Sequence, residues 1–183
     1  MLERLLITHC SPTLAGIKTG NLFQICFDSE DALRSELQDL SHKLNGKGIL
    51  FEVLRMKGRT ALILAYRPKR LEQDLAKRDI ALFLRDFGYL ESGLEYAISR
   101  LKERIDAQAG FPHEIGLFLG YPLTDVIGFI ENGGRNSKCT GCWKVYRDEG
   151  EAMKLFDRYK KCREVYSQMF AAGRSVTQLT VAA

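Results

Sequence analysis

The chain has 183 residues, of which 45% are hydrophobic, and it carries a formal net charge of +4. This length suits a single domain, and this hydrophobic content excludes an intrinsically disordered chain. The charge is well below that of a dedicated nucleic-acid binder. No apolar run approaches the roughly 18 residues that a membrane span requires.

The N-terminus and the cysteines predict a cytoplasmic protein. Residues 1–10, MLERLLITHC, contain charges within the apolar stretch and lack the layout of a signal peptide. Thiols stay mostly reduced in the cytoplasm. The five cysteines are therefore expected to be core residues, ligands or reactive thiols rather than a disulfide framework.

The first third of the chain predicts alternating strands and helices. Residues 2–9 form a short helix or strand that Pro12 ends, and residues 21–27 have the composition and alternation of a strand. Ser29 is a predicted N-cap for a helix in which leucines recur at helical spacing up to Leu44. Residues 48–56 and 60–66 then predict a β-hairpin.

The rest of the chain is mostly helical by pattern. Helices are expected over 68–87, over about 90–105, just after Pro112 and over 121–132, and a strand over 142–147. Asp148 and Glu151 resemble a capping box at the start of a long last helix. Residues 173–183 have the pattern of a flexible tail.

This order predicts an α+β fold in one domain, residues 1–183. We expect a mixed or antiparallel four-stranded sheet in the ferredoxin-like βαββαβ order, in which the first and last strands pair. Residues 68–134 would be an expanded helical insert, and a long helix would follow the last strand.

Cys139 and Cys142 have the spacing of a metal clamp, because a turn can direct two thiolates at one ion. Two further ligands would have to come from elsewhere, with His9 and Cys10 among the candidates. The same spacing suits a redox dithiol, although redox pairs usually begin a helix. Plain core packing of Cys142 is a third interpretation.

His9 and Cys10 are adjacent, and a histidine beside a cysteine can stabilise a thiolate nucleophile. These two residues are the catalytic candidates, with no third member assigned. The alternative is a helix end followed by a turn.

The loop PTLAGIKTGN, residues 12–21, combines glycines with Lys18 and could cradle an anion through backbone N–H groups. It does not match a Walker loop. An ordinary loop with a solvated lysine is the simpler interpretation.

His113, Trp143 and Lys144 are the remaining candidates for cofactor binding. His113 follows Pro112 near a predicted helix start, where a neutral imidazole is favoured and suits ligation. Trp143 and Lys144 belong to a stretch that mixes aromatic and basic residues, as single-strand nucleic-acid binders do. Burial of Trp143 against the last helix and the sheet is the alternative.

Three stretches carry a resemblance to a known family: HCSPTLAGIKTGNLF at 9–23, FPHEIGLFLGYPLTDVIGFIENGG at 111–134, and CTGCWKVY running into LFDRYKKC over 139–162. Together they resemble the domain-of-unknown-function 3793 family. The resemblance spans nearly the whole chain and implies a bacterial source, largely among anaerobes. It implies no activity.

Two functions follow as hypotheses, and neither decides whether the protein is an enzyme. The first is Cys- and His-based binding of a metal ion, an iron–sulfur cluster or a redox cofactor such as haem, with a redox protein as partner. The second is a binding module for an anionic ligand, nucleotide or RNA through Lys18, Lys144 and the aromatic residues. The modest net charge argues against nucleic acid.

Overall fold

The computed structural model describes residues 1–107 and 111–182, and contacts divide the chain into two compact units. Unit 1 consists of Met1–Leu71 together with Cys162–Ala183, and unit 2 is the continuous stretch Glu72–Lys161. The boundaries fall inside two helices, α3 (Pro68–Leu75) and α8 (Glu149–Ala171). A single domain with an insert over 68–134 was expected, and the contacts place a larger segment in unit 2.

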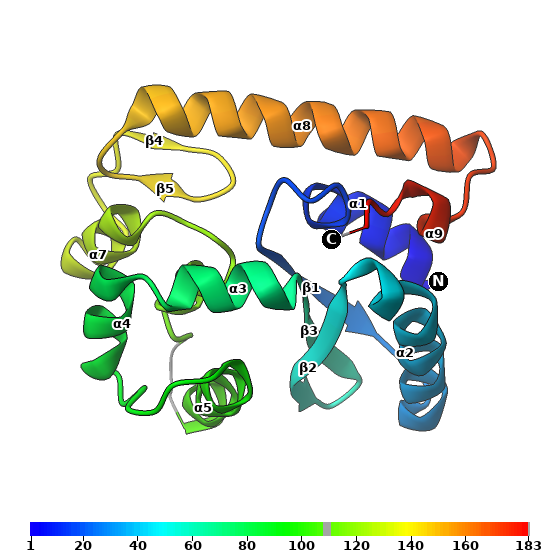
Figure 1. The fold of residues 1–183 in the computed structure, drawn as a ribbon, viewed down its shortest axis with the longest axis horizontal. Coiled ribbons are helices and arrows are strands. Elements are labelled where there is room, and N and C mark those ends of the chain that lie inside the picture. The colour runs from blue at the N-terminus through cyan, green and yellow to red at the C-terminus, as the bar shows by residue number, and fades with distance from the viewer. Residues whose placement is uncertain (108–110, 183) are drawn as a thin grey trace. The chain divides into compact units, whose positions relative to one another are not determined.

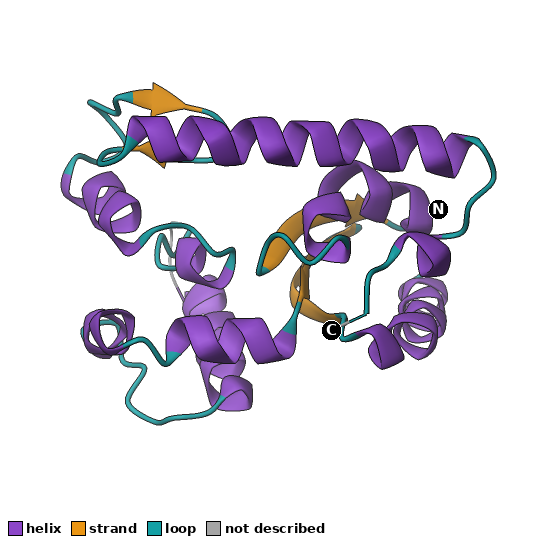
Figure 2. Cartoon of the chain, turned by 45° about the horizontal axis from the view of Figure 1, so that its top comes forward, coloured by secondary structure: helices purple, strands orange, loops and turns teal. Residues whose placement is uncertain are grey.

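Unit 1 is built around a three-stranded antiparallel sheet (Figures 1 and 2). Its strands are β1 (Gly20–Cys26), β2 (Leu50–Lys57) and β3 (Thr60–Tyr66), and β3 lies between the other two. The β2–β3 hairpin has the predicted position, and its register shifts at a bulge between Val53 and Arg55. Helices α1 (Leu2–Leu14), α2 (Glu30–Leu44) and α9 (Val176–Leu179) complete the unit, with a 3₁₀ turn at Asn45–Lys47.

Helix α2 forms as its sequence predicts. The Ser29 hydroxyl accepts a hydrogen bond from the backbone N–H of Ala32, which caps the first turn. The leucines of its apolar stripe are all buried in the unit 1 core: Leu33, Leu37, Leu40 and Leu44. One sheet face contributes Phe23, Ile25 and Ile63 to the same core.

Helix α1 extends beyond the proline that was expected to end it. Pro12 lies inside the last turn of the helix, which continues to Leu14. A proline removes one N–H from the helical hydrogen bonding. Because Pro12 is close to the end of the helix, the missing bond affects only the last turn, and the helix continues to Leu14.

The C-terminal residues, expected to be a flexible tail, form part of unit 1 up to residue 182. A capping box at Ser175 and Gln178 starts α9, and Val176 and Leu179 are buried in the core. The N–H of Val181 donates to the Leu14 carbonyl over 3.0 Å. Figure 1 shows α1 and α9 side by side.

Arg67 holds this C-terminal segment in place. Its guanidinium, only 6% exposed, donates to the carbonyls of Thr13 (2.7 Å), Leu14 (2.8 Å) and Val181 (2.8 Å). A weaker bond of 3.4 Å reaches the Lys47 carbonyl. Burial lowers the pKa of Arg67 from its usual value, and the electrostatic interaction with the Tyr166 side chain opposes this effect.

Unit 2 is largely helical. It contains α4 (Arg78–Arg85), α5 (Leu94–Ala107), α6 (Ile115–Phe118), α7 (Leu123–Glu131) and the first part of α8. The apolar stripe of α5 is buried as predicted at Ile98, Leu101 and Ile105. At the start of α8, Asp148 accepts from the N–H of Glu151, as the capping pattern indicates.

The predicted four-stranded ferredoxin-like sheet is wrong. The last strand pairs locally, because β4 (Cys139–Thr140) folds back antiparallel onto β5 (Lys144–Val145) as a separate two-stranded sheet. The next two N–H groups, of Tyr146 and Arg147, donate to the Asp125 carboxylate of α7. With these donors engaged inside unit 2, the stretch does not extend as a strand beside β1.

Candidate functional site

Unit 2 contains a cavity of about 260 Å³ that brings together α7, the β4–β5 hairpin and the segment before α6. Rings make up much of its wall, from five residues: Phe111, His113, Tyr121, Phe129 and Trp143. Three of the sequence-predicted candidates, His113, Trp143 and Lys144, line this cavity together. The cysteine pair and Lys18 do not.

Trp143 forms a rigid part of the wall. Its ring stacks on Tyr121 with centroids 4.8 Å apart, and it meets Phe156 of α8 edge-on at 4.6 Å. The indole N–H donates to Asp125 over 2.8 Å. The side chain is 7% exposed, so its predicted burial is confirmed, although it packs against rings of unit 2 and not against the three-stranded sheet.

Asp125 is a structural carboxylate at the cavity wall, 4% exposed. One oxygen accepts the Trp143 indole N–H, and the other accepts the N–H groups of Tyr146 (2.8 Å) and Arg147 (3.0 Å). Three donors offset its charge, as a buried carboxylate requires. This residue fixes the end of β5 against α7.

Two glycines permit this close packing. A Cβ on Gly141 would lie 2.3 Å from the Phe156 ring, and one on Gly128 would lie 2.5 Å from the Tyr146 ring. Either contact is far shorter than van der Waals distance. The hairpin therefore approaches α8 and α7 only because these positions lack side chains.

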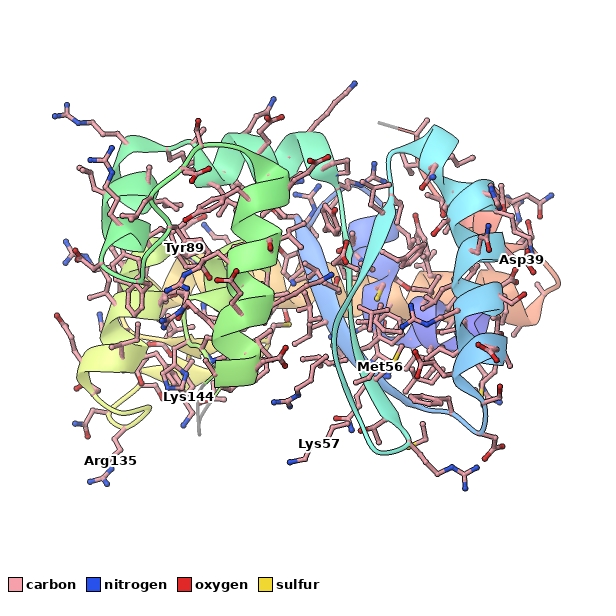
Figure 3. The ribbon with its side chains drawn as sticks, turned by 90° about the horizontal axis from the view of Figure 1, so that it is seen from below. Asp39, Met56, Lys57, Tyr89, Arg135 and Lys144 are labelled. Atoms are coloured by element: carbon pink, nitrogen blue, oxygen red, sulfur yellow. The ribbon has the colours of Figure 1, made fainter. Side chains whose placement is uncertain are left out.

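Lys144 and His113 both lie against Phe129. The Lys144 ammonium donates to the Gly134 carbonyl over 2.6 Å and lies 5.9 Å from the centre of the Phe129 ring. The His113 ring meets the same phenyl ring edge-on at 4.9 Å. His113 is exposed, and Lys144 is half-buried. Figure 3 shows Lys144 on the same side of unit 2 as Arg135, which points outwards.

The hairpin register explains why Cys139 is outside this cavity. Thr140 pairs with Lys144, and both line the cavity. Cys139 pairs with Val145, which is fully buried, and directly opposed residues share one face of a hairpin while successive residues alternate. Cys139 is therefore on the face away from Thr140.

The Cys139 thiol does not have the electrostatics of a metal ligand. Partial burial raises the pKa of Cys139, and the carboxylates of Glu149 and Asp125 raise it further. Cys142 lies in the hairpin loop, where its carbonyl accepts from the Tyr121 hydroxyl over 3.2 Å. Among residues 1–107 and 111–182, no group of three or more His, Cys, Asp or Glu side chains is placed to hold a metal ion.

The adjacent His9 and Cys10 have different surroundings in α1. His9 is exposed, whereas Cys10 is 0% exposed in the unit 1 core. Burial raises the pKa of Cys10 to about 12, although the positive charge of Lys18 opposes this. A catalytic thiolate requires partial exposure and a lowered pKa, so both properties are opposite to those expected.

The Gly-Lys loop is engaged in its own fold. The N–H groups of Gly16, Ile17 and Lys18 donate to carbonyls of Pro12 and Thr13. The Lys18 ammonium, 3% exposed, donates to the Gly20 carbonyl. An anion cradle needs outward N–H groups and an accessible cation, and this loop presents neither at these positions.

Several residues of unit 2 that shape its interior were missed from sequence. Asp125 could have been found, because a single carboxylate in the apolar stretch of residues 121–130 requires partners when buried. Glu114, 1% exposed, forms a buried ion pair with Arg104, and Tyr89 lies 3.4 Å from it. No local pattern indicated this cluster. Figure 3 shows Tyr89 among the helices of unit 2.

Comparison with known proteins gives the family and no activity. The family model described as "Protein of unknown function (DUF3793)" matches residues 6–180, nearly the whole chain. The protein therefore belongs to this family, which confirms the resemblance noted from the sequence. Neither the curated proteins nor the solved structures include a match. Within the described residues, every helix is too short or too polar to cross a membrane.

Proposed function

We propose that unit 2 is a binding module for a small planar organic ligand, held in the cavity beside Trp143. The observation that supports this most directly is the convergence of five rings on one cavity of about 260 Å³. Aromatic walls with a few polar groups are typical of ligand sites. The Trp143 ring is held by Tyr121, Phe156 and Asp125, so this wall is formed before any ligand enters.

The cavity volume limits the size of the ligand. Pockets for drug-sized ligands measure about 300–1,000 Å³. A volume of about 260 Å³ is below this range and suits one or two fused rings with a short substituent. A tetrapyrrole such as haem is too large for it.

Metal or cluster binding, our first hypothesis from the sequence, has less support. A structural metal site needs about four ligands. The Cys139–Cys142 pair has no third His, Cys, Asp or Glu placed to share a site among the described residues. The raised pKa of Cys139 also disfavours the thiolate that a metal would bind.

Nuclear magnetic resonance tests the proposal directly, because the chain contains one tryptophan and therefore one indole N–H resonance. The neutral bicyclic probe 2-naphthamide should shift this resonance saturably, with one site per chain. Phe129→Leu removes a ring from the wall and should weaken binding about tenfold, the effect of roughly 1.4 kcal/mol.

The matched control is Phe83→Leu. Phe83 belongs to α4 and packs on Phe87 at 5.0 Å, outside the residues that line the cavity. This variant should bind 2-naphthamide as the unmodified protein does. An indole resonance that stays unmoved up to the solubility limit of the probe would refute the proposed function.

A further inference from the structure

We propose that the cavity selects planar ligands that carry an anionic group, and that Lys144 and Thr140 bind this group. This inference rests on the proposed function and adds to it the chemical class of the ligand. It follows from the placement of polar groups around the cavity.

The hairpin register places two donors side by side. Thr140 and Lys144 are directly opposite each other in the β4–β5 pair, so their side chains emerge on one face. Both residues line the cavity. A hydroxyl beside an ammonium can bind two oxygens of a carboxylate or phosphate.

The Lys144 ammonium is held where a ligand can reach it. Its one described hydrogen bond goes to the neutral Gly134 carbonyl over 2.6 Å, and an ammonium has three N–H groups. Lys144 can therefore donate to an anion while it keeps this bond. No carboxylate forms an ion pair with Lys144 within the described residues.

Asp125, the acidic residue in the cavity wall, does not reverse this preference. Both of its oxygens accept hydrogen bonds, from the indole N–H of Trp143 and from two backbone N–H groups. These three donors compensate the negative charge of the Asp125 carboxylate. The other lining side chains that can carry a charge near neutral pH are Lys144 and His113, which carry positive or no charge.

Paired probes of one shape test the selectivity. We expect 2-naphthoate to bind at least fivefold more tightly than neutral 2-naphthamide, both followed by the Trp143 indole resonance. The ratio should fall as salt is raised, because part of the attraction is between charges near solvent.

Lysine variants identify the group responsible. Lys144→Met should reduce the ratio to about one by weakening naphthoate alone, and Lys144→Arg should restore most of it. Lys138→Met is the matched control, since Lys138 is on the same hairpin and also donates to a backbone carbonyl, that of Arg147, over 2.7 Å. It does not line the cavity, so the ratio should be unchanged.

The outcomes separate the two proposals. Equal binding of both probes overturns the anion selectivity, and a ratio that survives Lys144→Met overturns the assignment of this selectivity to Lys144. Either result leaves the planar-ligand function intact. Binding of neither probe overturns both. An indole resonance of each variant at its original position without probe shows that the hairpin is still folded.

Discussion

The buried cations of unit 1 and the lysine of the unit 2 cavity differ in their surroundings. In unit 1, Lys18 and Arg67 are buried and donate to backbone carbonyls, so they hold the chain together. In unit 2, Lys144 also contacts a carbonyl but lines a cavity. Lys18 therefore serves the fold of unit 1, whereas Lys144 lines a cavity of unit 2.

Buried polar side-chain atoms without a hydrogen-bond partner also distinguish the two units. Among the described residues, three buried side-chain atoms lack a partner: Arg100 Nε, Glu114 Oε2 and Tyr146 Oη. All three belong to unit 2. Buried polar groups without partners are costly. Unit 2 therefore has a less completely satisfied interior than unit 1.

The largest effect should appear in thiol labelling within unit 1. Cys10 is fully buried with its pKa raised to about 12, whereas Cys26 is exposed at the end of β1. The strand alternation points Phe23 and Ile25 inwards, which leaves Cys26 on the exposed face. We expect iodoacetamide at pH 8 to label Cys10 at least about 1,000-fold more slowly than Cys26, since an ordinary thiol has a pKa near 8.5.

Mass mapping of the labelled peptides gives the two rates. Mild urea should accelerate Cys10 and leave Cys26 nearly unchanged, because only Cys10 needs unit 1 to open. Comparable rates in native buffer would contradict the close packing of unit 1.

Removal of the Arg67 guanidinium should cost about 3–5 kcal/mol of unfolding free energy. Arg67→Met removes three hydrogen bonds of the guanidinium, to the carbonyls of Thr13, Leu14 and Val181, and a hydrogen bond to a charged group contributes about 1.5–3 kcal/mol. The Thr13 and Leu14 carbonyls each keep a backbone donor, so the total is less than three full contributions. The measurement is urea unfolding, in which the labelling of Cys10 reports the unfolded fraction.

Arg70→Met is the control for this change. Arg70 also donates to a carbonyl of the same loop, that of Gly16 over 2.7 Å, but it does so at the surface. Its loss should cost less than about 1 kcal/mol. Equal costs for the two arginines would show that burial of Arg67 has no special role.

In unit 2, Gly141→Ala should cost about 2–3 kcal/mol. The added methyl would lie 2.3 Å from the Phe156 ring, so the hairpin or the ring must shift. Trp143 fluorescence during urea unfolding follows the change, because the indole contacts the same phenyl ring. Gly150→Ala should be neutral or stabilising, since its Cβ would meet only Asp148, at 3.8 Å, near the start of α8.

The smallest predicted effect is a pH dependence that belongs to unit 1. A thiol whose pKa is raised by folding stabilises the folded state below its unfolded pKa near 8.5, and this contribution is lost as pH rises from there towards 12. Between pH 8.5 and 9.5 the free energy of unfolding should therefore fall, with a slope that approaches about 1.4 kcal/mol per pH unit. Cys10→Ala should flatten this slope, and Cys26→Ala should leave it unchanged.

Sequence patterns predicted the parts of the fold that depend on neighbouring residues. Ser29 caps α2 and Asp148 caps α8, because capping is decided within one turn. Gly133 and Gly134 end α7, since both N–H groups fold back onto carbonyls of the helix. The β2–β3 hairpin is equally local.

The errors concern contacts between distant residues. The strand at 144–145 was expected to join the sheet. It pairs with β4 instead, and the two N–H groups after it donate to Asp125, about 20 residues earlier in the chain. The C-terminal residues were expected to be a flexible tail. They are bound by Arg67, which lies 114 residues before Val181 in the chain. The sequence did not predict that Thr140 lines the cavity, because only the register of the hairpin places its side chain on the same face as that of Lys144.

The division of unit 1 between the two ends of the chain also affects the order of events during synthesis. Unit 2 is continuous, so all of its residues leave the ribosome before Val176 and Leu179, which complete the unit 1 core. Chains generally fold from the N-terminus as they emerge. Newly made α1 and α2 therefore lack these two core residues while unit 2 is made. A chain of residues 1–161 would contain the whole of unit 2 and still lack the residues that complete the unit 1 core.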